Sequence, residues 1–324
     1  MGTKRVDIIA PVYNEASCLR AFHLELEQAL APLRYSFRIL LIDDGSSDDT
    51  PTIARELAMR DARVRYVRLS RNFGHQAALT AGLDLSDGDA VVTMDSDLQH
   101  PPEQIGVFIA AWEAGAEVVN GRRASPQTGF SKHLTSKVFY RLLRRMIDVP
   151  LVMDSPDYRL LDRRAVRAVR CLREQGRFLR GIYAWIGFKQ VSVEYEEGGR
   201  FAGQSKYSLP VMVGFALSAV LSFSRVPLRA ATWLGLSVSS FAFLFGVYAV
   251  YQALVTRDVV PGWTSLAVLI SFLSGVQLVT LGIVGEYVGL ILDEVKRRPL
   301  YLVAEDSAEG SSAGPADAIP SGAD

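Results

Sequence analysis

The chain has few cysteines and no excess of charge of either sign. Its 324 residues include two cysteines, Cys18 and Cys171, which lie far apart and show no metal-binding spacing. This scarcity fits a reducing compartment and argues against a disulfide framework. The 35 basic residues balance the 35 acidic residues, so the zero net charge predicts no nucleic-acid partner.

Two further patterns are missing near the N-terminus. Residues 1–9 contain no apolar signal-peptide core, so we expect the N-terminal part to stay in the cytoplasm. The glycine-rich dinucleotide fingerprint is absent after the first expected strand, where Pro11-Val12-Tyr13-Asn14-Glu15 stands instead, and no P-loop pattern occurs. These absences argue against a nicotinamide enzyme and against a nucleoside triphosphatase.

Short apolar runs alternate with helical patterns over the first two thirds of the chain. We expect helices at residues 17–30 and 51–60 and from residue 77 onward, with Thr50 capping the second. The expected strands cover residues 6–10 (broken by Pro11), 37–42, 64–69, 90–94 and 118–120. This alternation predicts an α/β domain over residues 1–206 with a doubly wound, mostly parallel sheet. Such sheets bind ligands beyond the carboxyl ends of their strands.

The last third of the chain is apolar. Residues 228–254 and 263–292 each hold a single charged residue and are long enough to span a bilayer, which predicts a two-helix transmembrane hairpin. We expect residues 207–227 to form an in-plane amphipathic helix. Residues 305–324 have little apolar content and predict a disordered tail. Basic residues flank the hairpin on both sides, so the positive-inside rule predicts that the α/β domain and both termini are cytoplasmic.

An acidic pair, Asp95-Ser96-Asp97, follows the apolar run at residues 90–94. Strand side chains alternate between faces, so two acids two positions apart would point the same way at a strand tip. Neighbouring carboxylates repel unless a cation lies between them, and hard oxygen ligands suit Mg2+ or Mn2+. The alternative is a solvated acidic turn. Polar clusters at residues 11–15 and 43–44, expected at the same sheet edge, favour the metal site.

Seven motifs give the chain a family resemblance. Three of them resemble motifs of the family 2 glycosyltransferases with the GT-A fold: Pro11-Val12-Tyr13-Asn14-Glu15, Ile42-Asp43-Asp44-Gly45-Ser46-Ser47-Asp48 and Asp95-Ser96-Asp97-Leu98-Gln99-His100-Pro101-Pro102. The other four are similar to motifs of polyprenyl-phosphate glycosyltransferases, which include the bactoprenol glucosyltransferases of bacteria: Ser70-Arg71-Asn72-Phe73-Gly74, Asp157-Tyr158-Arg159-Leu160, Arg177-Phe178-Leu179-Arg180-Gly181 and Gly203-Gln204-Ser205-Lys206-Tyr207. The resemblance extends from Val6 to about Arg298.

The resemblance implies roles for the matching residues. Those implied to hold the nucleotide are Pro11, Tyr13, Glu15, Asp44 and Asp95. Those implied to bind Mg2+ or Mn2+ are Asp95, Asp97 and Gln99. Those implied to meet the acceptor phosphate are Arg122 or Arg123, Lys137, Arg200, Ser205 and Lys206. The implied catalytic residues are Asp97 and Asp157.

Asp157 matches a position often described as the catalytic base. The acceptor is a phosphate monoester with a second pKa near ~6, so it is largely a dianion at pH 7. A general base adds little when no proton needs removal. An organising role therefore stands beside the base role: Asp157 would orient Arg123 or Lys137, or help hold the metal.

The resemblance also implies an activity and its partners. The activity is inverting transfer of a sugar, with UDP-glucose as the favoured donor, to polyprenyl (undecaprenyl) phosphate in the bacterial inner membrane. The partners are the nucleotide sugar, the lipid, the membrane and further copies of the chain, with a tetramer favoured. One rival is a processive polysaccharide synthase, whose Gln-x-x-Arg-Trp element is not matched by Gln175-Gly176-Arg177-Phe178. The other rival is a catalytically dead scaffold, against which the intact acids argue.

Overall fold

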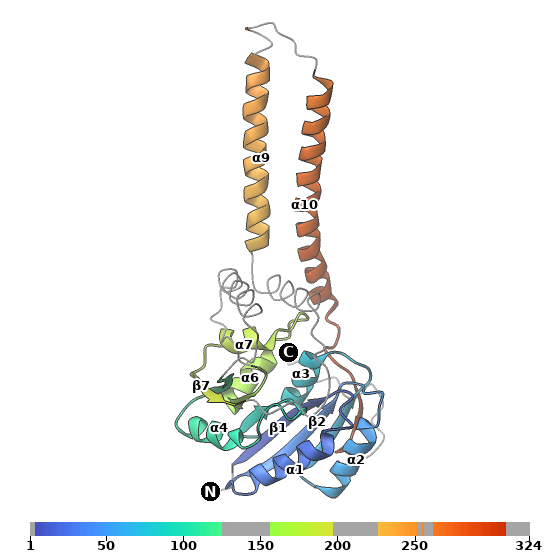
Figure 1. Ribbon diagram of the computed structural model, residues 1–324, viewed down its shortest axis with the longest axis vertical. Helices are drawn as coiled ribbons and strands as arrows, with labels where there is room; N and C mark the ends of the chain where they lie inside the picture. Colours follow the sequence, from blue (N-terminus) through green and yellow to red (C-terminus); the bar gives the residue numbers. More distant parts are fainter. Residues whose placement is uncertain (1–3, 125–155, 197–225, 252–254, 256–261, 309–324) are drawn as a thin grey trace.

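The computed structural model describes residues 4–124, 156–196, 226–251, 255 and 262–308 (Figure 1). An α/β domain lies at one end of the molecule, and two long helices extend away from it side by side. The expected in-plane helix falls on residues that lie outside the described ranges, up to residue 225.

The centre of the domain is an eight-stranded sheet in the order β7-β5-β6-β4-β1-β2-β3-β8. Parallel pairs join β1 to β2 and β4, β2 to β3, and β5 to β7, whereas β6 and β8 run antiparallel to their neighbours. The strands are β1 Arg5–Val12, β2 Ser36–Asp43, β3 Val64–Leu69, β4 Ala90–Thr93, β5 Val118–Arg123, β6 Arg159–Asp162, β7 Gln190–Tyr195 and β8 Val303–Asp306. The predicted α/β fold with a mostly parallel sheet is therefore confirmed.

Helices cover both faces of the sheet. They are α1 Leu19–Leu30, α2 Thr50–Arg60, α3 His75–Leu85, α4 Gln104–Glu113, α6 Arg163–Cys171 and α7 Leu179–Trp185. Strand residues alternate between two apolar clusters: Ile8 packs with α1, α2 and α4, whereas its neighbour Ile9 packs with α3, α6 and α7. Burial of the strands on both faces explains their continuous apolar sequence, which is typical of parallel sheets.

Two local predictions were wrong. Strand β1 continues through Pro11 to Val12, because β4 pairs only with Val6–Ile9 and no hydrogen bond is required on that side of Pro11. Thr50 is the first residue of α2 and not its cap. The cap position is held by Asp49, whose side chain makes no capping bond. The Thr50 hydroxyl instead accepts the Glu15 N–H at 2.8 Å. Thr50 thereby ties the start of α2 to the loop after β1.

The predicted start of the disordered tail, residue 305, is too early. Glu305 and Asp306 belong to β8, which pairs antiparallel with β3. Their carboxylates bind Arg55 and Arg65 on the domain, so partners distant in the sequence compensate for the low apolar content. Residues 309–324 lie outside the described ranges.

The two long helices are α9 Val226–Tyr251 and α10 Trp263–Lys296. Both contain segments long and apolar enough to cross a membrane, at residues 226–248 and 268–296. In the most apolar stretch of each helix, 6% of the α9 residues and 0% of the α10 residues are buried. The core helix of a soluble protein would be mostly buried. Large side chains such as Phe241, Phe243 and Leu281 are exposed. Length, composition and exposure together indicate membrane association for this hairpin.

Gly45, in the turn after β2, should tolerate no larger residue. Its φ is +73°, and an added Cβ would lie 2.6 Å from the backbone carbon of Arg71. We expect Gly45→Ala to cost about 1–3 kcal/mol for the backbone conformation, with the clash in addition. The midpoint of thermal unfolding in detergent should therefore fall.

The matched control is Gly106→Ala within α4, where the nearest atom to the added Cβ lies at 3.4 Å. Alanine has the higher helix propensity, so this variant should be neutral or slightly stabilising. Equal midpoints for the two variants would contradict the steric argument.

Candidate active site

The loops that follow β1, β2 and β4 meet at one edge of the sheet, as the sequence predicted. The backbone N–H of Asn14, after β1, donates to the Ser46 hydroxyl after β2 at 3.0 Å. The Asn14 side chain accepts the Ser47 N–H at 2.9 Å. The Ser96 hydroxyl, after β4, donates to the Pro11 carbonyl at 3.1 Å. These contacts join the three polar clusters directly.

The loop after β1 combines exposed and buried groups. Tyr13 is exposed, and Asn14 adopts a left-handed φ of 56°, which turns the chain sharply away from the strand. The Glu15 carboxylate accepts the Cys18 thiol at 3.0 Å. Burial and this contact raise the pKa of Cys18 to about 12, so the thiol stays protonated and is no nucleophile.

Asp44 is buried and holds another turn in place. Its two carboxylate oxygens accept the backbone N–H groups of Phe73 at 2.7 Å and Gly74 at 2.9 Å. Burial raises the pKa of Asp44, while these two hydrogen bonds act in the opposite direction. The bonded turn leads directly into α3 and places His75, its first residue, at the sheet edge.

The acidic pair lies beyond β4 and not at its tip. Strand β4 ends at Thr93, so the alternation of strand side chains does not orient Asp95 and Asp97, and that part of the prediction was wrong. The loop itself orients them: the Asp95 N–H donates to His100 Nδ1 at 3.0 Å, and the Gln99 N–H donates to Asp97 Oδ1 at 3.1 Å. The Asp95 side chain keeps 35% of its exposure.

The residues of this loop fit a divalent cation. Within the described ranges, no group of three or more His, Cys, Asp or Glu side chains forms a complete metal site. Mg2+ commonly takes only one or two carboxylates from the protein and completes its shell with water and substrate phosphates. Asp95 and Asp97 supply such a partial set. Gln99 contributes its backbone N–H to the loop.

Asp157 is the most heavily contacted acid of the site. It is 5% exposed and meets Arg180 Nε at 3.2 Å, Gln76 Nε2 at 3.3 Å, His75 Nε2 at 3.5 Å and an Arg159 nitrogen at 3.7 Å. Burial alone would raise the pKa of Asp157, but the positive charge of Arg180, the His75 contact and Arg159 outweigh it and hold that pKa well below its usual range. Such a carboxylate is a poor proton acceptor, which favours the organising role.

His75 joins Asp157 to the acidic loop, a link that the sequence motifs did not reveal. Its Nε2 lies 3.5 Å from Asp157 and 3.6 Å from Asp95. Burial lowers the pKa of His75, but the hydrogen bond that its ring donates to Asp157 and the charge of Asp95 outweigh it and raise the pKa to about 9. The ring is 43% exposed, so water moderates the effect. The available signal was the position of His75, directly after the motif that ends at Gly74.

His100 supports the same loop. It is 1% exposed and stacks on Tyr158 with ring centroids 4.8 Å apart. The Asp95 N–H donates to its Nδ1, so that nitrogen carries no proton, and burial lowers the pKa of the ring in the same sense. Its role is to hold the backbone of Asp95.

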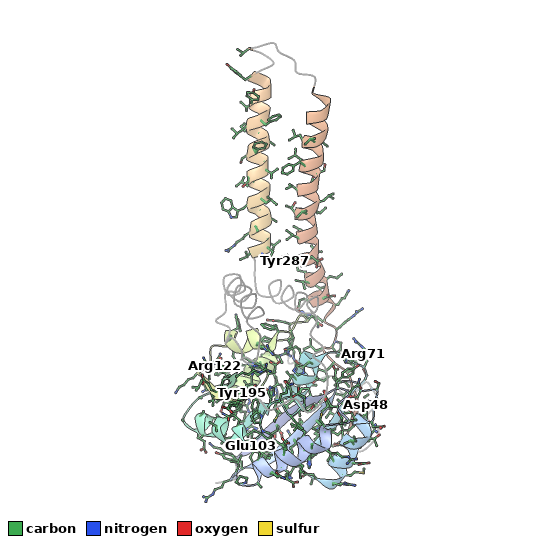
Figure 2. The ribbon with its side chains drawn as sticks, in the orientation of Figure 1. Asp48, Arg71, Glu103, Arg122, Tyr195 and Tyr287 are labelled. Atoms are coloured by element: carbon green, nitrogen blue, oxygen red, sulfur yellow. The ribbon has the colours of Figure 1, made fainter. Side chains whose placement is uncertain are left out.

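The two candidate arginines of β5 have different surroundings. Arg122, which is labelled beside Tyr195 in Figure 2, is exposed and forms an ion pair with Glu194 on β7. Arg123 is half-buried and pairs in register with Tyr195, whose ring lies edge-on to His100 at 6.0 Å, so it lies on the side of the acidic loop. Of the two, only Arg123 is placed toward the site. The other acceptor candidates, Lys137, Arg200, Ser205 and Lys206, lie outside the described ranges.

A partly exposed acidic loop thus lies at the carboxyl edge of a mostly parallel sheet, and comparison with known proteins identifies the family. The model for glycosyl transferase family 2 matches residues 7–170, and the chain belongs to this family.

Two relatives illustrate the relationship. An uncharacterised glycosyltransferase of Bacillus subtilis (strain 168), YkcC, is 40% identical over 297 residues, which are 91% of this chain and 92% of that one. The SfII prophage-derived bactoprenol glucosyl transferase of Shigella flexneri is 38% identical over 300 residues, 92% of this chain and 97% of the relative. The resemblance read from the motifs is confirmed.

A solved structure with a partly similar fold is the glucosyl-3-phosphoglycerate synthase of Mycobacterium tuberculosis in complex with phosphoglyceric acid. It is 19% identical with a TM-score of 0.47, over 68% of this chain and 79% of that one. The family assignment rests on the sequence matches.

The ion pair of His75 and Asp157 links stability to pH. The raised pKa of His75 means that its contribution is complete below its ordinary value of 6.5 and is lost as the pH rises through about 9. The lowered pKa of Asp157 means that its contribution is present above its ordinary value of 3.8 and is lost as the pH falls through the lower folded-state value. The pair therefore stabilises the fold most between these two limits.

Removing the Asp157 charge should change how His75 titrates. In the metal-free protein, we expect Asp157→Asn to lower the His75 pKa from about 9 toward 6.5, since the strongest partner of the imidazolium is lost. NMR titration of the histidine ring protons, assigned with a His75→Gln variant, measures the shift. Asp61→Asn, which removes a carboxylate remote from His75, should leave this titration unchanged. An unaltered His75 pKa in Asp157→Asn would contradict the pairing.

Proposed function

We propose that this protein transfers a sugar from a nucleotide sugar to a polyprenyl phosphate at the membrane. The observation that carries the proposal is that the acidic site and the two exposed apolar helices belong to one chain. A soluble donor and a membrane-held acceptor can therefore meet at the same protein. Relatives named bactoprenol glucosyl transferases, whose similarity extends over the hairpin as well as the α/β domain, support the same reading.

The donor is proposed to be UDP-glucose, because those relatives are named as glucosyl transferases. Its nucleoside lies against Pro11, Tyr13, Glu15 and Asp44, and its diphosphate against Asp95, Asp97 and Gln99. Both oxygens of Asp44 already accept a backbone N–H, so a nucleoside contact uses their remaining lone pairs.

Mg2+ or Mn2+, held by Asp95 and Asp97, would neutralise the charge that develops on the leaving diphosphate. The neighbouring side chains keep these two acids in place and balance their charge. His75 supplies a positive charge beside Asp95. Arg123 lies on the same side as the acidic loop and is the basic residue proposed to receive the acceptor phosphate.

The acceptor phosphate is proposed to attack the anomeric carbon directly. Its oxygen forms a bond to that carbon while the bond to the diphosphate oxygen breaks, so the configuration inverts and no covalent enzyme intermediate is needed. The phosphate is already largely ionised at pH 7 and needs no base. Asp157, with its lowered pKa, therefore acts by holding Arg180 and His75 in position.

The membrane arrangement belongs to the same proposal. The α/β domain and both termini face the cytoplasm of a bacterium, because basic residues flank the hairpin at Arg229 and at 296–298, and the short connection between the helices lies outside. Assembly into a homo-oligomer, with a tetramer favoured, is proposed from the family resemblance alone.

The test of function is incubation of the purified protein with polyprenyl phosphate, either metal ion and a panel of sugar nucleotides. We expect one sugar per lipid, identified by mass, with UDP-glucose the best donor. Asp95→Asn and Asp97→Asn should each lower the rate at least about a hundredfold, because charge stabilisation at the leaving group is lost. Chelator should do the same to the wild type. Full activity in excess EDTA would overturn the metal, and a polymeric product would favour the processive rival.

The acceptor site can be tested by kinetics. We expect Arg123→Ala and Lys206→Ala to raise the KM for polyprenyl phosphate about tenfold and to change the KM for the sugar nucleotide much less, since each loses a charge-assisted contact. Arg122→Ala is the matched control, because Arg122 pairs with Glu194 at the surface. An effect confined to the sugar nucleotide would show that these residues serve the donor.

A further inference from the structure

The chain returns to the α/β domain after it leaves α10. Arg297, directly after the last residue of the helix, has a left-handed φ of 46° and ends the helix. The segment Arg297–Ser307, here called the strap, then follows the edge of the sheet and forms β8 against β3 (Figure 1). The strap therefore joins a membrane helix to the sheet that carries the site.

Backbone contacts fix the register of the strap along β3. The Ser70 N–H donates to the Leu302 carbonyl at 2.8 Å at one end of the strand pair. At the other end the Ser307 N–H donates to the Tyr66 carbonyl at 2.9 Å, and the Tyr66 N–H donates to the Ser307 hydroxyl at 2.9 Å. Both ends of β8 are thus anchored, and the strand cannot slide.

Two ion pairs and two apolar side chains add to this backbone pairing. Arg55 on α2 makes two bonds of 2.7 Å to Glu305, and Arg65 Nε on β3 binds Asp306 at 3.0 Å. Asp306 retains only 5% of its exposure, so water screens this pair little. Tyr301 and Val303 pack against the apolar cluster beneath α3. Such a paired, bidentate set is stronger than an isolated surface ion pair.

A second contact joins the end of α10 to the loop before α7. The Gln175 N–H donates to Glu294 on α10 at 2.6 Å, and the Gln175 side chain donates to the Arg298 carbonyl at 2.6 Å. Helix α7 follows this loop and carries Arg180, which binds Asp157. The end of α10 thus meets the domain next to the helix that organises the active site.

We propose that the strap positions the active site relative to the membrane and so sets how the membrane-held acceptor reaches it. This inference rests on the proposed function. The exposed apolar side chains of α10 fix that helix in the bilayer, and the strap fixes the sheet to α10. Strand β3 is the neighbour of β2, which ends at Asp43, directly before the proposed nucleoside contact Asp44. Displacing a reacting group by 1 Å costs about a hundredfold in rate, so a loose domain would lose the membrane reaction.

Two kinds of acceptor should depend differently on the strap. A polyprenyl phosphate in a bilayer can approach only from the membrane, so its transfer depends on the orientation of the domain. A short, water-soluble isoprenyl phosphate and the sugar nucleotide arrive from solution in any direction. Releasing the strap should therefore affect the bilayer acceptor alone.

The experiment reverses the charge of the strap. We expect Glu305→Arg with Asp306→Arg, opposite Arg55 and Arg65, to lower transfer to the bilayer acceptor at least about tenfold. Transfer to the short acceptor should stay within about twofold of wild type. Adding Arg55→Glu and Arg65→Glu should restore the bilayer reaction, because the ion pairs form again with opposite sense.

The matched control reverses two acids elsewhere. Glu27→Arg with Glu56→Arg changes the net charge equally. These two acids pair with Arg63, which precedes β3, and with Arg20 on α1, away from the strap, so the double variant should preserve both reactions. Retained bilayer activity in the strap variant overturns the inference, as does an equal loss with both acceptors, which would mean that the strap only stabilises the domain. If the wild type glycosylates neither acceptor, the proposed function itself fails.

Discussion

A carboxylate buried as deeply as Asp157 stays charged only if positive groups surround it, and this requirement organises the active site. Its partners come from separate parts of the chain: His75 begins α3, Arg180 lies on α7, and Arg159 begins β6. Each must reach the same two oxygens, so these elements are held in one arrangement. Because His75 also meets Asp95, the charge balance of the interior extends to the acidic loop.

The loops at the sheet edge are held mainly by one another. Side chains with short reach, such as Asn14, Ser96 and Thr50, bond the backbone of a neighbouring loop and not their own. The buried Asp44 bonds a neighbouring turn in the same way, and the buried His100 bonds the backbone of its own loop. Groups that would meet a nucleotide sugar are therefore placed before it binds, and this reduces the ordering cost of binding. A site of this kind depends on many contacts that no single motif contains.

The elements that the sequence predicted and those it did not predict differ in how they are stabilised. Strands β1 to β5 have apolar runs that are buried on both faces, and periodicity alone located them. Strand β6 ends in charged residues, β7 is largely exposed, and β8 is acidic. These strands form because they pair with a neighbouring strand or because their carboxylates bind arginines distant in the sequence. Such pairing is invisible to a local pattern.

The sequence by itself determined the α/β class, the position of the polar clusters at the strand ends, the apolar hairpin and the family. Local periodicity, charge and motif spacing carry that information. Only the tertiary structure decided that Asp157 is surrounded by Arg180 and His75, that Arg123 and not Arg122 lies toward the acidic loop, and that Glu305 belongs to a strand. The physical reason is that a pKa, an ion pair or an edge strand depends on groups brought together from distant positions, and sequence order does not record their distances.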